Sequence, residues 1–151
     1  MAKLRVTKRF TMETGHALYG YDGKCRNVHG HGYKLYVTII GEPILDPSNV
    51  KHGMVMDFGD LKTIVKEEIL DQYDHAIVLN KNSPHKEMGK ELEDLGNNVI
   101  YADFQPTSEL LVTHFAHRIQ SRLPKTVQLF SVRLHETDSN YAEWYASDNQ
   151  Q

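Results

Sequence analysis

The sequence predicts an α+β fold, in which a four-stranded antiparallel sheet carries two helices on one face in the order β-β-α-α-β-β. Three observations predict it. Segments near both ends of the chain alternate apolar and polar residues, as half-buried strands do. Two segments between them repeat apolar residues at helical spacing. The length of 151 residues suits one domain spanning residues 1–151.

The first two strands are predicted around a glycine-rich stretch. In residues 3–12 one parity is apolar, carrying Leu4, Val6, Phe10 and Met12. Residues 33–41 are rich in β-branched and aromatic side chains and form the expected antiparallel partner, which Pro43 ends. The glycine-punctuated residues 15–32 are predicted to be a loop and hairpin connection.

Two helices and two further strands follow. Asp57 is a plausible N-cap for a helix over residues 58–72. A second helix is expected from Thr107 to just before Pro124. The apolar positions that predict these helices are Leu61, Ile64, Val65 and Ile69 in the first, and Leu111, Phe115 and Ile119 in the second.

The remaining segments complete the predicted order. Residues 128–136 alternate again, and residues 141–146 make a last strand. Residues 80–98 are polar and contain Pro84, Gly89 and Gly96. They are predicted to be a long loop or insertion that could include one helical turn.

Composition limits the classes of partner. The formal charge is −3, from 17 Lys and Arg against 20 Asp and Glu, and no basic run is present. Binding to nucleic acid or to an anionic membrane is therefore not expected. A single cysteine cannot form an intrachain disulfide, and no stretch of about 18 apolar residues occurs. We expect a soluble cytoplasmic protein.

The densest chemistry lies in residues 25–31, which read CRNVHGH. On an extended strand, His29 and His31 point to the same face and can bind one metal ion. His16, after the first strand, could supply a third nitrogen ligand. Three neutral imidazoles favour zinc or another borderline first-row ion over magnesium or calcium. The alternative is a pair of solvated histidines in a glycine-rich turn.

Cys25 has three possible roles. It could be a fourth zinc ligand that closes a structural site, a small buried apolar residue, or a reactive thiol near a cation. A closed site would leave zinc without a position for substrate, whereas three histidines alone leave one open. The spacing of the sequence does not separate these readings.

Two acidic positions are also candidates. Asp74 and His75 follow the first predicted helix and are either an acid/base pair or a solvated pair at the helix end. Glu136 ends an apolar row of one strand parity, which consists of Phe130, Val132 and Leu134. A carboxylate there needs either an internal Arg or Lys, or a ligand that offers two parallel N–H donors.

Taken in order, the motifs resemble those of the 6-pyruvoyl-tetrahydropterin synthase family. They are His16 followed by CRNVHGH, MDFGDLK, YDHAIVLN, PTSE and HETDSN, and they run from about residue 10 to residue 143. The three-residue gap between Cys25 and His29 is similar to the branch of the family that makes 6-carboxy-5,6,7,8-tetrahydropterin in queuosine biosynthesis. The resemblance implies a tunnelling fold, in which sheets of several subunits join into a barrel.

The resemblance also implies the roles of individual residues. Zinc would be bound by His16, His29 and His31, and Cys25 would be the catalytic thiol. Asp74 and His75 match a proton relay. Glu136 matches the glutamate that anchors the pterin ring, and Thr107 and Ser108 match a turn that contacts it.

The implied reaction is zinc-dependent conversion of 7,8-dihydroneopterin triphosphate to 6-carboxy-5,6,7,8-tetrahydropterin, with release of acetaldehyde and triphosphate. The implied assembly is a trimer or hexamer with active sites between subunits. Two alternatives stay open at this point. One is a 6-pyruvoyl-tetrahydropterin synthase, which eliminates triphosphate without carbon-carbon cleavage. The other is a non-catalytic binding module stabilised by zinc.

Overall fold

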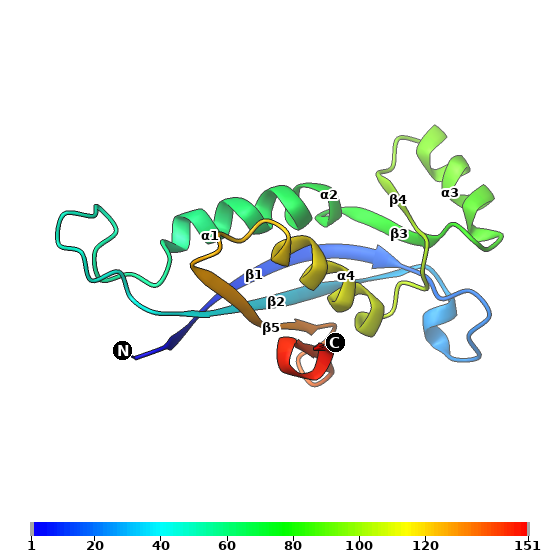
Figure 1. The fold of residues 1–151 in the computed structure, drawn as a ribbon. Coiled ribbons are helices and arrows are strands. Elements are labelled where there is room, and N and C mark those ends of the chain that lie inside the picture. The colour runs from blue at the N-terminus through cyan, green and yellow to red at the C-terminus, as the bar shows by residue number, and fades with distance from the viewer. Residues whose placement is uncertain (1, 151) are drawn as a thin grey trace.

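The computed structural model describes residues 2–150 as a curved sheet with helices packed against it (Figure 1). The six strands lie in the order β4-β3-β1-β2-β5-β6. The strands are β1 (Leu4–His16), β2 (His29–Gly41), β3 (Ala76–Asn80), β4 (Val99–Ala102), β5 (Val127–His135) and β6 (Tyr141–Tyr145). The helices are α1 (Phe58–Val65), a π-helical segment (Lys66–Leu70), α2 (Asp71–Tyr73), α3 (His85–Asp94) and α4 (Ser108–Gln120), with short 3-10 turns at Lys24–Arg26 and Ala146–Asn149.

The core forms between the long strands and the two helical segments that were predicted. β1 and β2 pair antiparallel along their whole length. Phe10 and Leu35 are opposite each other in this pair and are buried, as are Leu61 of α1 and Phe115 of α4. The helical periodicity of both segments is confirmed, and Asp57 is the N-cap of the first as expected, because it accepts a hydrogen bond from Gly59 N at 2.7 Å.

The prediction of four antiparallel strands is wrong, because the sheet has six strands and is mixed. β3 pairs parallel with β1, and β4 pairs parallel with β3. Residues 85–94, expected to lie in a loop, form α3, which connects the two parallel strands. β3 and β4 have only five and four residues, and Val78 and Leu79 are both buried. Strands buried on both faces show no alternation of apolar and polar residues.

The glycine-rich stretch is also more ordered than predicted. Both long strands continue through it, so His16 pairs with His29 and the connection is only residues 17–28. Gly15 and Gly32 lie in strands, and neither has a positive φ. A Cβ at Gly15 would meet the His29 carbonyl at 3.3 Å. These glycines therefore permit close packing of the strands, where the sequence suggested turns.

The apolar row expected on β5 is interrupted once. Thr38 of β2 pairs with Ser131, but Ile39 pairs with Leu129, so Phe130 is an extra residue in a β-bulge. Phe130 consequently leaves the core-facing row, and the Arg5 guanidinium lies 3.9 Å from the centre of its ring. Val132 and Leu134 remain in the row and are buried. None of the helices within residues 2–150 has the length and apolar character needed to cross a membrane.

Candidate metal and substrate site

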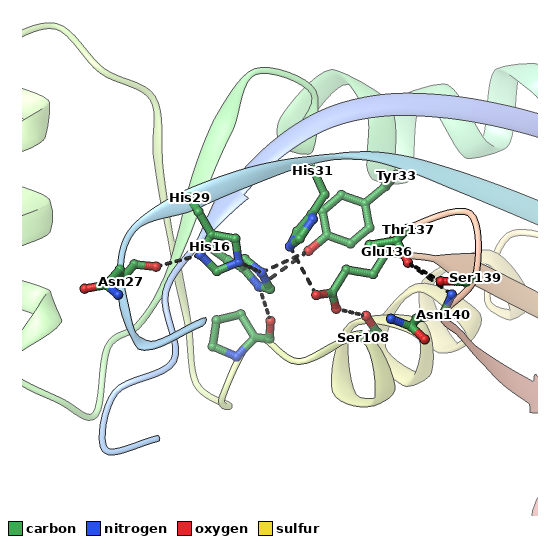
Figure 2. Close-up of polar contacts among 11 residues, drawn as sticks. His16, Asn27, His29, His31, Tyr33, Ser108, Glu136, Thr137, Ser139 and Asn140 are labelled. Atoms are coloured by element: carbon green, nitrogen blue, oxygen red, sulfur yellow. Dashed lines mark hydrogen bonds and ion pairs between the residues drawn. The ribbon is translucent and has the colours of Figure 1, made fainter. Parts of the chain in front are cut away.

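Three histidines converge at the end of the long hairpin (Figure 2). His16 is the last residue of β1 and pairs with His29, the first residue of β2. His31 follows two residues later and points to the same face. With Glu136, just beyond β5, these residues place four potential ligand atoms within 4.8 Å of one another. The pairing of the strands therefore assembles the histidine cluster that the sequence suggested.

Backbone carbonyls fix the tautomers of two of these rings. His16 Nδ1 lies 2.7 Å from the Pro106 carbonyl oxygen, and His29 Nδ1 lies 2.6 Å from the Asn27 carbonyl oxygen. A carbonyl can only accept a hydrogen bond, so each Nδ1 carries the hydrogen and each Nε2 of the neutral ring carries a lone pair. Carbonyl partners of this kind commonly orient metal-binding histidines.

The two lone pairs face each other. The Nε2 atoms of His16 and His29 are 3.0 Å apart. Two acceptors at this distance repel unless a cation or a proton lies between them. Two nitrogens bound to a tetrahedral zinc ion at about 2.0–2.1 Å are separated by roughly 3.3 Å, close to the observed spacing. The residues therefore fit a zinc ion without large rearrangement.

Glu136 lies between the ring of His31 and the hydroxyl of Ser108. Its Oε1 lies 3.1 Å from His31 Nε2, and its other carboxylate oxygen accepts a hydrogen bond from the Ser108 hydroxyl. His31 Nε2 is buried, yet it makes no well-aligned hydrogen bond to any residue between 2 and 150. No Arg or Lys among residues 2–150 forms an ion pair with Glu136. The carboxylate thus borders the histidine cluster instead of a buried cation.

Burial favours the neutral form of His16 and His31, because it lowers the pKa of both. Desolvation lowers the pKa of His16, and the neighbouring imidazoles lower it further, against an opposing effect of the hydrogen bond to Pro106. Desolvation also lowers the pKa of His31, although Glu136 opposes this shift. The pKa of the fully buried Tyr33 is raised by desolvation, then by Glu136 and Cys25. Neutral imidazoles are the form that binds a metal.

Cys25 lies in the short 3-10 turn Lys24–Arg26, within the connection 17–28. Its side chain is partly buried and reduced, and it is not one of the four residues whose ligand atoms converge. The Cys25 thiol is therefore not one of the converging ligand atoms. The Cys25 carbonyl accepts a hydrogen bond from Leu18 N at 3.0 Å, within the same connection.

Asp74 and His75 form a pair away from the cluster. His75 Nδ1 lies 3.1 Å from Asp74 Oδ1, which also accepts a hydrogen bond from Glu13 N at 2.9 Å. His75 has a φ of 63°, and its main-chain N–H donates to the Glu13 carbonyl at 2.6 Å. Its side chain is 75% exposed. The pair is thus ordered by β1, but the imidazole faces solvent.

The turn before α4 contributes contacts that the sequence did not reveal. Thr107 caps α4 by accepting a hydrogen bond from Leu110 N at 3.2 Å, and Ser108 binds Glu136. Pro106 and Asn27 act through backbone carbonyls, which side-chain patterns do not report. Tyr33 lies under His16, with its hydroxyl 3.4 Å from His16 Nδ1.

The sequence profile of 6-pyruvoyl tetrahydropterin synthases matches residues 5–147. The chain belongs to this family. It is 36% identical to a 6-carboxy-5,6,7,8-tetrahydropterin synthase of Haemophilus influenzae, over 93% of this chain and 97% of that protein. It is 32% identical to the human 6-pyruvoyl tetrahydrobiopterin synthase, over 90% of this chain and 87% of that protein. The family resemblance predicted from the motifs is confirmed.

Solved structures agree with this assignment. The 6-pyruvoyl tetrahydropterin synthase of Caenorhabditis elegans superposes with a TM-score of 0.67 at 25% identity, covering 97% of both chains. An uncharacterized protein of Wolinella succinogenes superposes with a TM-score of 0.79 at 20% identity, covering 97% of this chain and 99% of that one. The latter likeness concerns the fold alone.

We expect acidification to destabilise the metal-free protein through the histidine cluster. In the unfolded chain the imidazoles of His16 and His31 regain the ordinary pKa of 6.5, whereas burial lowers it in the folded chain. Below that pH the unfolded state therefore binds more protons, and the free energy of unfolding falls. Calorimetry between about pH 7.5 and pH 5.5 should give a smaller fall in Tm for His16→Gln than for the wild type. Parallel pH dependences would contradict this.

Proposed function

We propose that this protein converts 7,8-dihydroneopterin triphosphate and one water molecule to 6-carboxy-5,6,7,8-tetrahydropterin, acetaldehyde and triphosphate, as a step in queuosine biosynthesis. The observation that carries the proposal is the convergence of three histidines and Glu136 in a chain of this family. The 6-carboxy reaction is favoured because the Haemophilus influenzae relative of that name matches nearly the whole chain.

In this proposal His16, His29 and His31 hold a zinc ion. Three neutral imidazoles suit zinc, and the fourth position stays available to substrate oxygens, because the Cys25 thiol does not join the cluster. When bound, zinc supplies a Lewis acid that lowers the pKa of side-chain hydroxyls of the substrate and stabilises negative charge that develops beside them.

Glu136 is proposed to anchor the pterin ring. A carboxylate has about four lone-pair positions, and the Ser108 hydroxyl engages one of them. The positions that remain can accept the two parallel N–H donors of the pterin 2-amino group and N3–H. Ser108 then keeps the carboxylate oriented, and Thr107 fixes the turn that carries Ser108. This contact would orient the side chain of the substrate toward the histidines.

Cys25 is proposed to be the base. As a thiolate it would take a proton from carbon of the substrate side chain, and a nearby cation would favour that charged form. His75 would move protons during tautomerisation and loss of triphosphate, with Asp74 holding the tautomer of its ring.

The exposure of His75 suggests that it serves the site of a neighbouring subunit. We propose a homo-oligomeric barrel of the tunnelling-fold type, a trimer or hexamer, in which this side chain meets the histidine cluster of another copy. The Asp74–His75 pair is held on the β1 main chain, yet its imidazole is 75% exposed. A subunit interface would remove that exposure and complete the set of groups that the reaction needs.

The shared site predicts complementation between inactive variants. Cys25→Ala and His75→Ala subunits, co-expressed in equal amounts, should recover roughly a quarter of wild-type activity, since random mixing leaves that share of sites with both groups intact. As the control, Cys25→Ala mixed with Glu136→Gln should recover none if both residues act in one subunit's site. A monomeric mass in solution, or no recovery in the first mixture, would contradict the shared site.

Incubation with dihydroneopterin triphosphate and zinc, followed by identification of products, tests the function. We expect 6-carboxy-5,6,7,8-tetrahydropterin and acetaldehyde. Cys25→Ala should keep its zinc and lose turnover by at least about 100-fold, because it lacks the base. A 6-pyruvoyl product without acetaldehyde would assign the other branch of the family. Loss of zinc together with activity would make Cys25 a ligand of a structural site, as in a non-catalytic module.

Glu136→Gln tests recognition of the ring. The amide retains the size of the carboxylate but replaces one acceptor with a donor, so it cannot receive two parallel N–H groups. We expect binding of a dihydropterin without the triphosphate chain to weaken by roughly 10- to 100-fold, the loss of one charge-assisted contact. Metal analysis should find zinc unchanged. Wild-type affinity for the pterin would remove Glu136 from this role.

A further inference from the structure

The turn 105–108 touches three parts of the site at once. The Gln105 side-chain amide donates to the Tyr19 carbonyl at 2.9 Å, and the neighbouring Pro106 carbonyl accepts from His16 Nδ1. Ser108, at the start of α4, binds Glu136. The contact between Gln105 and Tyr19 has no role in the reaction proposed above.

The contact matters because the connection 17–28, which carries Cys25, has few other restraints. It extends beyond the ends of β1 and β2 (Figure 1), and most of its residues are exposed. Within residues 2–150, the bond from Gln105 to Tyr19 is the one hydrogen bond that joins this connection to a part of the chain other than its flanking strands. The ring of Tyr19 also packs edge-on against His85 of α3, with centroids 5.3 Å apart.

A second amide sets the direction of the Gln105 side chain. Asn80 Nδ2, at the end of β3, donates to Gln105 Oε1 at 3.3 Å. The Asn80 oxygen is itself engaged by Asn82 N at 2.9 Å, which leaves the Asn80 NH₂ group to face Gln105. The Gln105 NH₂ group is therefore turned toward the Tyr19 carbonyl. These hydrogen bonds form a chain that runs from Asn80, at the end of β3, through Gln105 to Tyr19 in the connection 17–28.

We propose that Gln105 is a positioning residue for the Cys25 thiol. It fixes Tyr19, and the adjacent Leu18 N–H holds the Cys25 carbonyl at 3.0 Å. Gln105 and Pro106 are consecutive. The same turn therefore fixes the position of the connection 17–28, which carries Cys25, relative to the ring of His16. The inference rests on the proposed function of Cys25 as a base, whose efficiency depends on its placement within about 1 Å.

Gln105→Glu isolates this contact. Glutamate keeps the oxygen that accepts from Asn80 but places a second oxygen against the Tyr19 carbonyl, so the bond becomes a repulsion. We expect zinc content to match the wild type, KM to change by less than about twofold, and kcat to fall about 10- to 100-fold. Cys25 is the only cysteine of the chain, and iodoacetamide alkylates it at a rate that depends on pH. This pH dependence should differ between Gln105→Glu and the wild type, both with and without zinc.

Asn80→Asp provides an independent variant in which Gln105 is intact. It removes the NH₂ donor, so the Gln105 amide should turn its own NH₂ group toward the new carboxylate and away from Tyr19. The same fall in kcat and the same alkylation profile are expected. Gln128→Glu is the matched control, because it makes the same change at an exposed position of β5, paired with Ile40.

The results separate this inference from the proposed function. A wild-type protein that does not act on dihydroneopterin triphosphate would end the proposed function, whereas the alkylation comparison would still test Gln105. Wild-type kcat and alkylation in Gln105→Glu would overturn the positioning role. Loss of zinc in that variant would also overturn it, since Gln105 would then support His16 instead of the thiol.

Discussion

The site depends on one constraint, which is that two imidazole lone pairs are aimed at each other and cannot turn away. The carbonyls of Pro106 and Asn27 hold the Nδ1 hydrogens of His16 and His29, and the antiparallel pairing of β1 and β2 places the two rings side by side. The facing Nε2 atoms, 3.0 Å apart, are stable only with positive charge between them. The main chain therefore sets both tautomers, and a cation between the rings would offset the repulsion of their lone pairs.

Much of the fold could be predicted because its largest parts obey simple periodicities. The caps and apolar positions of the helical segments, and the alternation in β1 and β2, were visible in the sequence. β3 was missed because a short strand buried on both faces has no alternating pattern, and β4 was missed because it has only four residues. The available signal for such a strand was a short run of apolar residues, such as Ile77, Val78 and Leu79. The glycines of the hairpin misled for a related reason: they serve close strand packing, and composition alone suggests turns.

The candidate site divides in the same way. Side chains with distinctive chemistry and short spacing, above all His29 and His31, could be singled out from the sequence, and the structure brings them together with His16 and Glu136. Contacts made by backbone carbonyls and by Gln105 could not, because any residue carries a carbonyl and polar residues in turns are common. The exposed His75 marks the other limit, since the partner proposed for it on a second copy would leave no pattern within one chain.

The tautomers of His16 and His29 can be observed directly by long-range ¹H–¹⁵N correlation NMR of histidine-labelled protein, titrated with zinc at neutral pH. Both rings should carry the hydrogen on Nδ1 before and after zinc is added, and zinc should shift the ¹⁵N resonance of Nε2 in each. A ring that carries its hydrogen on Nε2 in the zinc-loaded protein, or a zinc-dependent shift confined to Nδ1, would contradict the claim that the main chain aims these two lone pairs at one cation.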